Sequence, residues 1–152
     1  MDKHALKDRV DRLMVMFGLS SRQNDLIEGF SKGMKQKVLI AAALIHDPPI
    51  IFLDEPTSAL DPRASMVVRD LIKDLSTKAN KTVFVSSHFL PLMEDICDRI
   101  AIINQGKLVA LGTVQEIISQ AGTPDLEQAF IELTGGKDTL ELLSWRDPVE
   151  TT

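Results

Sequence analysis

Two adjacent carboxylates, Asp54 and Glu55, follow an apolar run at residues 50–53 and precede Pro56. The run is typical of a buried β-strand, and carboxylates at the carboxyl end of such a strand are kept where they can meet a cation and a reacting water. This pattern favours magnesium-dependent nucleotide hydrolysis, in which Asp54 would hold Mg²⁺ and Glu55 would polarise the attacking water. A solvated turn is the alternative. The strand before the pair and the sequence Ser-Ala-Leu-Asp after it favour functional carboxylates.

A second candidate site lies at residues 31–34, Ser-Lys-Gly-Met, where a helix is expected to begin. The Ser31 hydroxyl, the backbone N–H groups and the positive end of the helix dipole suit an anion such as a γ-phosphate, and Gly33 permits a close approach. Read alone, the same residues are an ordinary capped helix. Their position ahead of the Asp-Glu strand favours the anion site. Lys35 is expected on a solvated face, whereas Lys37 stays open between a phosphate contact and a solvated position.

His88 follows two serines at the end of another strand-type run, residues 82–86. A neutral imidazole there could hydrogen-bond a γ-phosphate or orient the water beside Glu55. A lone histidine is usually structural. Open parallel sheets, however, place their sites outside the carboxyl ends of the strands, where His88 and Glu55 could meet in one crevice. We therefore predict Glu55 and His88 as catalytic residues and Asp54 as the metal ligand.

The composition limits the classes of protein that need to be considered. The 152 residues, 44% hydrophobic and 26% charged, suit one domain with a single core. A net charge of −5 without a basic block argues against nonspecific nucleic-acid binding. The longest apolar stretch, residues 38–45, is far shorter than a membrane span, and the amino end has no signal-peptide core, so a cytosolic location is expected. Cys97, the single cysteine, is expected to be a small core residue.

Helices and strands alternate along the chain, which predicts an α/β fold with a parallel sheet. Ser31 should cap a largely buried second helix, and Asp61 should cap a third. Residues 104–106 should join a hairpin, and Thr113 with Glu116 should form a capping box. The expected helices cover about residues 6–17, 31–45, 61–78, 90–97, 113–120 and 123–135, and the expected strands cover about 50–53, 82–86, 99–103 and 107–111.

Four segments in order carry a family resemblance: residues 30–36 (Phe-Ser-Lys-Gly-Met-Lys-Gln), 50–56, 58–61 (Ser-Ala-Leu-Asp) and 86–88 (Ser-Ser-His). They resemble the signature, Walker B, D-loop and H-loop of an ATP-binding cassette (ABC) transporter ATPase. The resemblance covers about residues 3–136. It implies an incomplete P-loop NTPase-type parallel sheet with flanking helices, together with part of the ABC helical subdomain.

In that family each ATP lies between the phosphate loop of one subunit and the signature of the other, so the resemblance implies ATP and Mg²⁺ as cofactors. Asp54, Glu55 and His88 would serve ATP bound in cis. The remaining site residues would contact ATP bound by a partner subunit or lie at the dimer seam: Ser31, Lys32, Gly33, Met34 and Asp61. The implied partners are a second ATP-binding subunit and a transmembrane permease subunit. The implied location is cytoplasmic, peripheral at the inner face of the cell membrane.

Two departures from the family pattern bear on activity. The usual signature is Leu-Ser-Gly-Gly-Gln, so Phe30, Lys32 and Met34 differ, whereas Ser31 and Gly33 are retained. The phosphate loop, Gly-x-x-x-x-Gly-Lys-Ser/Thr, and the Q-loop are absent from these 152 residues. The chain is therefore expected to be the carboxyl-terminal part of a cassette and to hydrolyse ATP poorly or not at all in isolation.

The resemblance also predicts how the chain is organised. Residues 1–46 would hold the helical subdomain and signature helix, residues 47–136 the remaining cassette elements, and residues 137–152 a tail. Loss of the phosphate-loop strand would expose apolar faces, so oligomerisation, swapping or partner binding is expected.

Other functions remain open. An accessory half that donates its signature in trans to a complete cassette is the alternative, and the product of a truncated reading frame is the third possibility. A DNA-maintenance ATPase is disfavoured because the long heptad segments typical of such proteins are absent.

Overall fold

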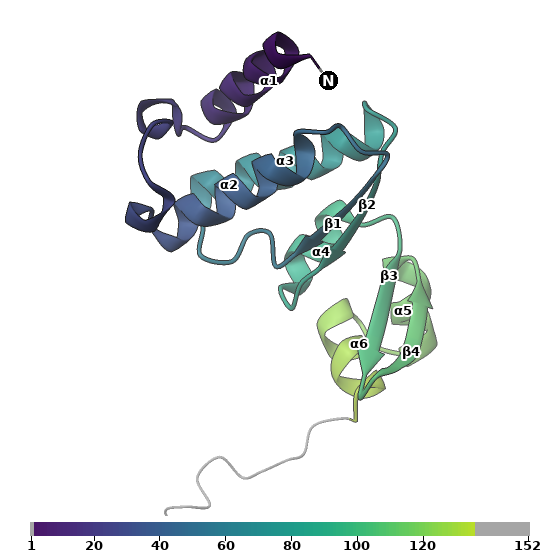
Figure 1. The fold of residues 1–152 in the computed structure, drawn as a ribbon. Helices are drawn as coiled ribbons and strands as arrows, with labels where there is room; N and C mark the ends of the chain where they lie inside the picture. The colour runs from purple at the N-terminus through teal and green to yellow at the C-terminus, as the bar shows by residue number, and fades with distance from the viewer. Residues whose placement is uncertain (1, 136–152) are drawn as a thin grey trace, which may run out of the picture. The chain divides into compact units, whose positions relative to one another are not determined.

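The computed structural model describes residues 2–135, and the chain divides into two compact units, one ending at Phe89 and one beginning at Leu90 (Figure 1). The first unit contains α1 (Lys3–Met16), the 3₁₀ turns η1 (Ser20–Arg22) and η2 (Ile27–Gly29), α2 (Lys32–Leu44), β1 (Ile50–Asp54), α3 (Pro62–Thr77) and β2 (Thr82–Ser86). The second contains α4 (Leu90–Ile96), β3 (Ile100–Asn104), β4 (Lys107–Gly112), α5 (Val114–Ala121) and α6 (Leu126–Leu133). The alternation of helices and strands confirms the predicted α/β class.

The first unit is built on a parallel pair of strands, which confirms the predicted sheet. β1 and β2 pair in register from Ile50 opposite Thr82 to Asp54 opposite Ser86. Side chains alternate along β1, so one face of the strand is buried and the other is exposed. The buried side chains of β1 and of α3, which contacts β2, are Ile51, Leu53, Ala64, Val68 and Ile72. This packing fixes the carboxyl ends of both strands at one edge.

Side-chain caps start the two helices that flank the site. The Ser31 hydroxyl accepts the N–H of Met34 at 3.2 Å, and a carboxylate oxygen of Asp61 accepts the N–H of Ala64 at 2.9 Å. Pro62 occupies the first turn of α3, where its missing N–H costs no helical hydrogen bond. Both caps confirm the sequence prediction.

The predicted burial of α2 was wrong. Within α2 only Ile40 is buried, and Leu39 is 65% exposed. α2 is apolar on more than one side, but α1 and β1, the elements that contact it, cover only one strip of its surface. Hydrophobic content alone therefore did not reveal how much of the helix would find a partner.

The second unit contains the predicted hairpin and capping box. β3 and β4 are antiparallel, and Gln105 and Gly106 between them have φ values of 49° and 74°, as a two-residue turn of this kind requires. The capping box forms at the start of α5. α6 begins later than the predicted start at about residue 123, and Asp125 caps it by accepting the N–H of Gln128 at 2.8 Å. The predicted tail, 137–152, lies outside the described residues.

Candidate functional site

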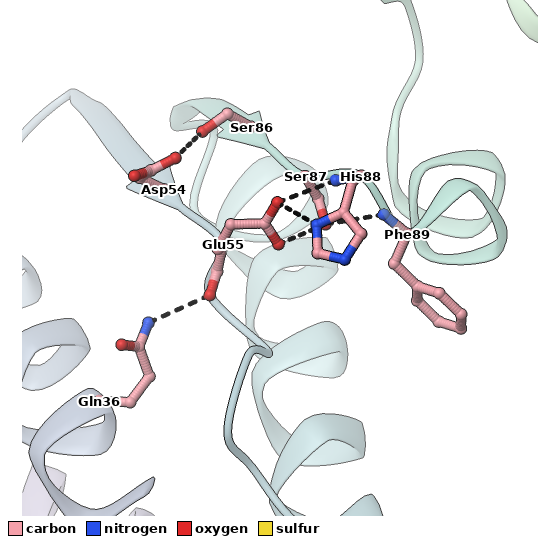
Figure 2. A network of polar contacts seen from close by, with 7 residues as sticks. All are labelled: Gln36, Asp54, Glu55, Ser86, Ser87, His88 and Phe89. Carbon is pink, nitrogen blue, oxygen red and sulfur yellow. Dashed lines mark hydrogen bonds and ion pairs between the residues drawn. The ribbon is translucent and has the colours of Figure 1, made fainter. Parts of the chain in front are cut away.

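The Glu55 carboxylate is held by the residues that follow β2 (Figure 2). Oε1 accepts the backbone N–H of His88 at 2.9 Å and lies 2.6 Å from Nδ1 of its ring, while Oε2 accepts the Ser87 hydroxyl at 3.0 Å. The backbone N–H of Glu55 donates to the carbonyl of Ser86 at 2.8 Å. Because parallel strands end at the same edge of a sheet, β1 and β2 bring Glu55 and His88 together, as the sequence suggested.

These contacts keep Glu55 ionised. The hydrogen bond from the His88 ring holds the pKa of Glu55 below its ordinary value, and the His88 N–H and Ser87 hydroxyl act in the same direction against the effect of partial burial. An ionised carboxylate can only accept, so Nδ1 of His88 donates to it. The His88 side chain is 87% exposed. A general base must be unprotonated, so the ionised Glu55 carboxylate is suited to that role. The part of the His88 ring that does not contact Glu55 is open to solvent.

Asp54 lies at the same strand edge and has a different partner. It is exposed, and its carboxylate accepts the Ser86 hydroxyl from the opposing position of β2. Within residues 2–135 no group of three or more His, Cys, Asp or Glu side chains is arranged to hold a metal ion. Magnesium in nucleotide enzymes is commonly held by one or two carboxylates together with substrate phosphates. The Asp54 and Ser86 oxygens fit an ion shared in this way.

The start of α2 and the segment before α3 enclose a hollow of about 390 Å³. Its lining residues are Ser31, Lys32, Gly33, Met34, Lys37, Ala59, Leu60 and Asp61. The structure therefore brings together all of the residues that the resemblance assigned to a partner's nucleotide or to the dimer seam. Lys37, left open by the sequence, also lines the hollow. The pKa of Asp61 is lowered mainly by the N–H of Ala64 and further by the charge of Lys37.

Gly33 has a role within the chain itself. A Cβ at this position would lie 2.6 Å from the carbonyl oxygen of Ala59, which no real Cβ tolerates. The glycine therefore lets the first turn of α2 pack directly on the backbone of the loop before α3. The missing side chain of Gly33 was expected to let a phosphate come close, but the Ala59 carbonyl already occupies the space on one side of Gly33.

Sequence reasoning missed Gln36, whose side chain contacts the backbone at the candidate catalytic residue Glu55. Its side-chain amide donates to the carbonyl oxygen of Glu55 at 3.3 Å (Figure 2). The same amide donates to the carbonyl oxygen of Pro56 at 3.5 Å. Gln36 lies three residues after Gly33, so both fall on one face of α2. The sequence carried no signal for this contact, because it depends on the backbone conformation of the loop after β1.

Comparison with known proteins gives consistent results. The family model for ABC transporters matches residues 2–58. The ABC transporter ATP-binding protein NatA of Bacillus subtilis (strain 168) is 37% identical over 131 residues, which are 86% of this chain and 53% of NatA. The methionine import ATP-binding protein MetN 1 of Yersinia pestis bv. Antiqua (strain Antiqua) is 37% identical over 129 residues, which are 85% of this chain and 37% of MetN 1.

Solved structures show the same likeness. An ATP-binding subunit of an ABC transporter superposes with a TM-score of 0.78 at 32% identity. The matched region is 88% of this chain and 56% of the chain of that subunit. A dimeric post-hydrolysis state of the ATP-binding cassette MJ0796 bound to ADP and Pi superposes with a TM-score of 0.68 at 31% identity, covering 74% and 49%. The chain thus spans about half the length, or less, of these relatives. No helix within residues 2–135 is both long enough and apolar enough to cross a membrane.

Proposed function

Because the chain belongs to the family of ABC transporter ATP-binding subunits, we propose that it is the carboxyl-terminal portion of such a subunit, whose complete form hydrolyses ATP to drive transport across a membrane. The observation that carries this proposal is the Glu55 carboxylate, kept ionised by His88 and Ser87 at the strand edge that also presents Asp54. NatA is named as an ATP-binding protein and MetN 1 as a methionine import protein, which supports transport as the role.

Each residue at the strand edge has a distinct task in this proposal. Glu55 polarises the attacking water, since its carboxylate is ionised and partly exposed. His88 orients Glu55 through Nδ1 and presents the rest of its ring to the γ-phosphate or to the water. Asp54, with the Ser86 hydroxyl that donates to it, would hold Mg²⁺. The magnesium ion, when bound with ATP, neutralises charge that develops on the phosphates.

The hollow at the start of α2 is the proposed contact for a nucleotide bound by a second ATP-binding subunit. The α2 N-terminus offers backbone donors near Ser31, and Lys32 and Lys37 add positive charge. The dimeric state of MJ0796 with ADP and Pi supports a paired arrangement. A transmembrane permease subunit is the other proposed partner. It would place the protein in the cytoplasm at the inner face of the membrane.

We propose that this polypeptide alone has little or no ATPase activity. Its 152 residues contain no Gly-x-x-x-x-Gly-Lys-Ser/Thr sequence. Nothing within them therefore supplies the backbone N–H cradle and lysine that position the β- and γ-phosphates beside Glu55. The Glu55 carboxylate is ionised and oriented, but the ATP must be positioned beside it by a phosphate loop from another source.

The proposal is tested by supplying that loop. The amino-terminal part of NatA, up to the matched region, is joined to this chain, and magnesium-dependent ATP hydrolysis by the purified chimera is measured. We expect turnover that falls by about 10²-fold or more in Glu55→Gln, because a general base contributes on that order. Glu28→Gln, an exposed carboxylate far from β1 in sequence, is the matched control and should keep full activity. A chimera that hydrolyses ATP equally well with Glu55→Gln contradicts the proposal.

A non-catalytic role is the second candidate, because the hollow gathers Ser31, Gly33 and Lys37 without any contribution from the strand edge that holds Glu55. In this role the chain donates Ser31 and Gly33 to ATP held by a complete cassette. Mixing the unmodified chain with intact NatA separates the two. Stimulation of NatA turnover that is lost in Ser31→Ala supports donation in trans, whereas unchanged NatA turnover leaves the catalytic portion as the function.

A further inference from the structure

The start of α2 contacts the loop between β1 and α3, residues 55–61, at two separate points. At one point the bare Cα of Gly33 lies against the carbonyl of Ala59. At the other, the Gln36 amide reaches the carbonyl oxygens of Glu55 and Pro56. Gly33 and Gln36 are three residues apart on a helix, so a single helix face contacts both ends of the loop.

The loop adopts a conformation that needs support from its surroundings. Glu55 has φ of 43° and Ala59 has φ of 64°, values in the left-handed region that residues with a side chain seldom occupy. Such conformations persist only where neighbouring groups hold them. Each of these residues lies against α2 through one of the two contacts just described.

The backbone of Glu55 is fixed on both sides of its Cα. Its N–H donates to the Ser86 carbonyl at 2.8 Å, and its carbonyl accepts from the Ser58 N–H at 3.0 Å as well as from Gln36 at 3.3 Å. The φ and ψ of a residue set the direction of its Cα–Cβ bond and limit the rotamers that its side chain can adopt. These three hydrogen bonds therefore restrict where the Glu55 carboxylate can lie, and it lies against Ser87 and His88 (Figure 2).

We propose that Gln36 is a positioning residue for Glu55: its side-chain amide holds the Glu55 carbonyl so that the residue keeps the left-handed conformation from which its carboxylate reaches Ser87 and His88. The helix that begins at the anion-binding hollow is thereby tied to the carboxylate at the strand edge. The importance of this tie for hydrolysis rests on the proposed function, but its existence in the folded chain does not.

The test needs no nucleotide, so its failure is distinct from a failure of the proposed function. The readout is the backbone amide of His88, which donates to Glu55 at 2.9 Å. Its chemical shift and its exchange rate with water are measured by NMR on the full 152-residue chain. Glu55→Ala defines the signal of His88 when the contact is lost completely.

Two variants separate donation by Gln36 from mere filling of space. Gln36→Glu keeps the size of the side chain and removes its donors, whereas Gln36→Lys keeps a donor on a chain of similar reach. Lys35→Gln changes the net charge by the same amount as Gln36→Glu at an exposed neighbouring position, and it is the matched control. The amide of Met34, which donates to Ser31, reports in every variant whether α2 still begins normally.

We expect Gln36→Glu to move the His88 amide toward its position in Glu55→Ala and to raise its exchange rate about 2- to 10-fold, the range for one hydrogen bond. Gln36→Lys and Lys35→Gln should leave it near the wild-type position. An unmoved His88 amide in folded Gln36→Glu overturns the proposal, even if that variant melts at a lower temperature. If Gln36→Glu fails to fold, Gln36→Met takes its place, because it keeps a side chain of similar length without a donor or a charge. A displaced His88 signal in Gln36→Met supports the proposal, and a wild-type signal overturns it.

Discussion

Glu55 is the residue on which the proposed chemistry of this chain depends, and the pKa of its carboxyl group is lowered by its neighbours. His88 contributes both its ring and its N–H, and Ser87 contributes a hydroxyl, so these donors come from the two residues that follow β2. Hydrogen bonds to the ionised form lower a carboxyl pKa because protonation would break them. The same contacts that orient Glu55 for a water therefore also link its charge to the stability of the fold.

This linkage predicts a pH dependence with a definite sign. The pKa of Glu55 in the folded chain lies below its ordinary value of 4.5, so its contribution to stability is fully present above that value. The contribution is lost as the pH falls through the lowered pKa. We expect the urea midpoint of the wild type to fall more steeply with acidification below pH 4.5 than that of Glu55→Gln. Parallel profiles for the two proteins would show that the His88 and Ser87 contacts do not favour the ionised form.

At the scale of elements, the packing of α2 on the loop before α3 sets the shape of the hollow. We expect Gly33→Ala to destabilise the chain by about 1–3 kcal/mol, because its Cβ would meet the Ala59 carbonyl at 2.6 Å and the backbone would have to shift. Gly29→Ala is the matched control, since a Cβ there has nothing within 4 Å. Equilibrium unfolding in urea measures both variants. If Gly33→Ala is as stable as Gly29→Ala, the backbone at Ala59 can shift away from the new Cβ at little cost in free energy, and the expectation is wrong.

Elements that rest on local chemistry were predictable from the sequence. The caps at Ser31 and Asp61 each involve a side chain and an N–H three residues later. The parallel sheet was expected from the alternation of strands and helices, whereas the register of β1 and β2 was not predicted. The contact of Gln36 with Glu55 spans 19 residues and depends on a backbone conformation that no pattern of residue types encodes. The exposure of Leu39 escaped prediction for the same reason, because burial depends on which elements pack on a helix. The start of α6 was placed too early because Thr123-Pro124 is typical of a helix start, and a second suitable capping residue, Asp125, follows it directly.

At the scale of the whole molecule, the site belongs to one of the two compact units. All of the residues of the strand edge and of the hollow lie in the unit that ends at Phe89. The relatives match well beyond that unit, over 131 residues in NatA. All of the residues that this chain would contribute to the proposed chemistry therefore come from the first unit, while the likeness to transporter ATPases extends over both units.

The first unit also exposes a large apolar surface on its sheet. Ile50, Phe52 and Phe84 are 50%, 73% and 54% exposed, and the two phenyl rings stack with centroids 4.9 Å apart on directly opposed positions of β1 and β2. Exposed apolar patches of neighbouring aromatic side chains favour association. The oligomerisation expected from the sequence remains a prediction, and this face is where the structure would locate it.

We expect the chain to bind the dye ANS and to gain mass with concentration, as measured by light scattering after size exclusion. The double variant Phe52→Thr/Phe84→Thr should lower the ANS fluorescence several-fold and reduce the concentration dependence, since threonine keeps the β-propensity and removes the apolar rings. Phe89→Thr is the control, because Phe89 is 56% exposed but lies after the end of β2. Equal losses in the double variant and in Phe89→Thr would assign the signal to exposed aromatic rings in general. A loss confined to the double variant would assign association to this face of the sheet, because the exposed ring that remains at Phe89 would then not sustain it.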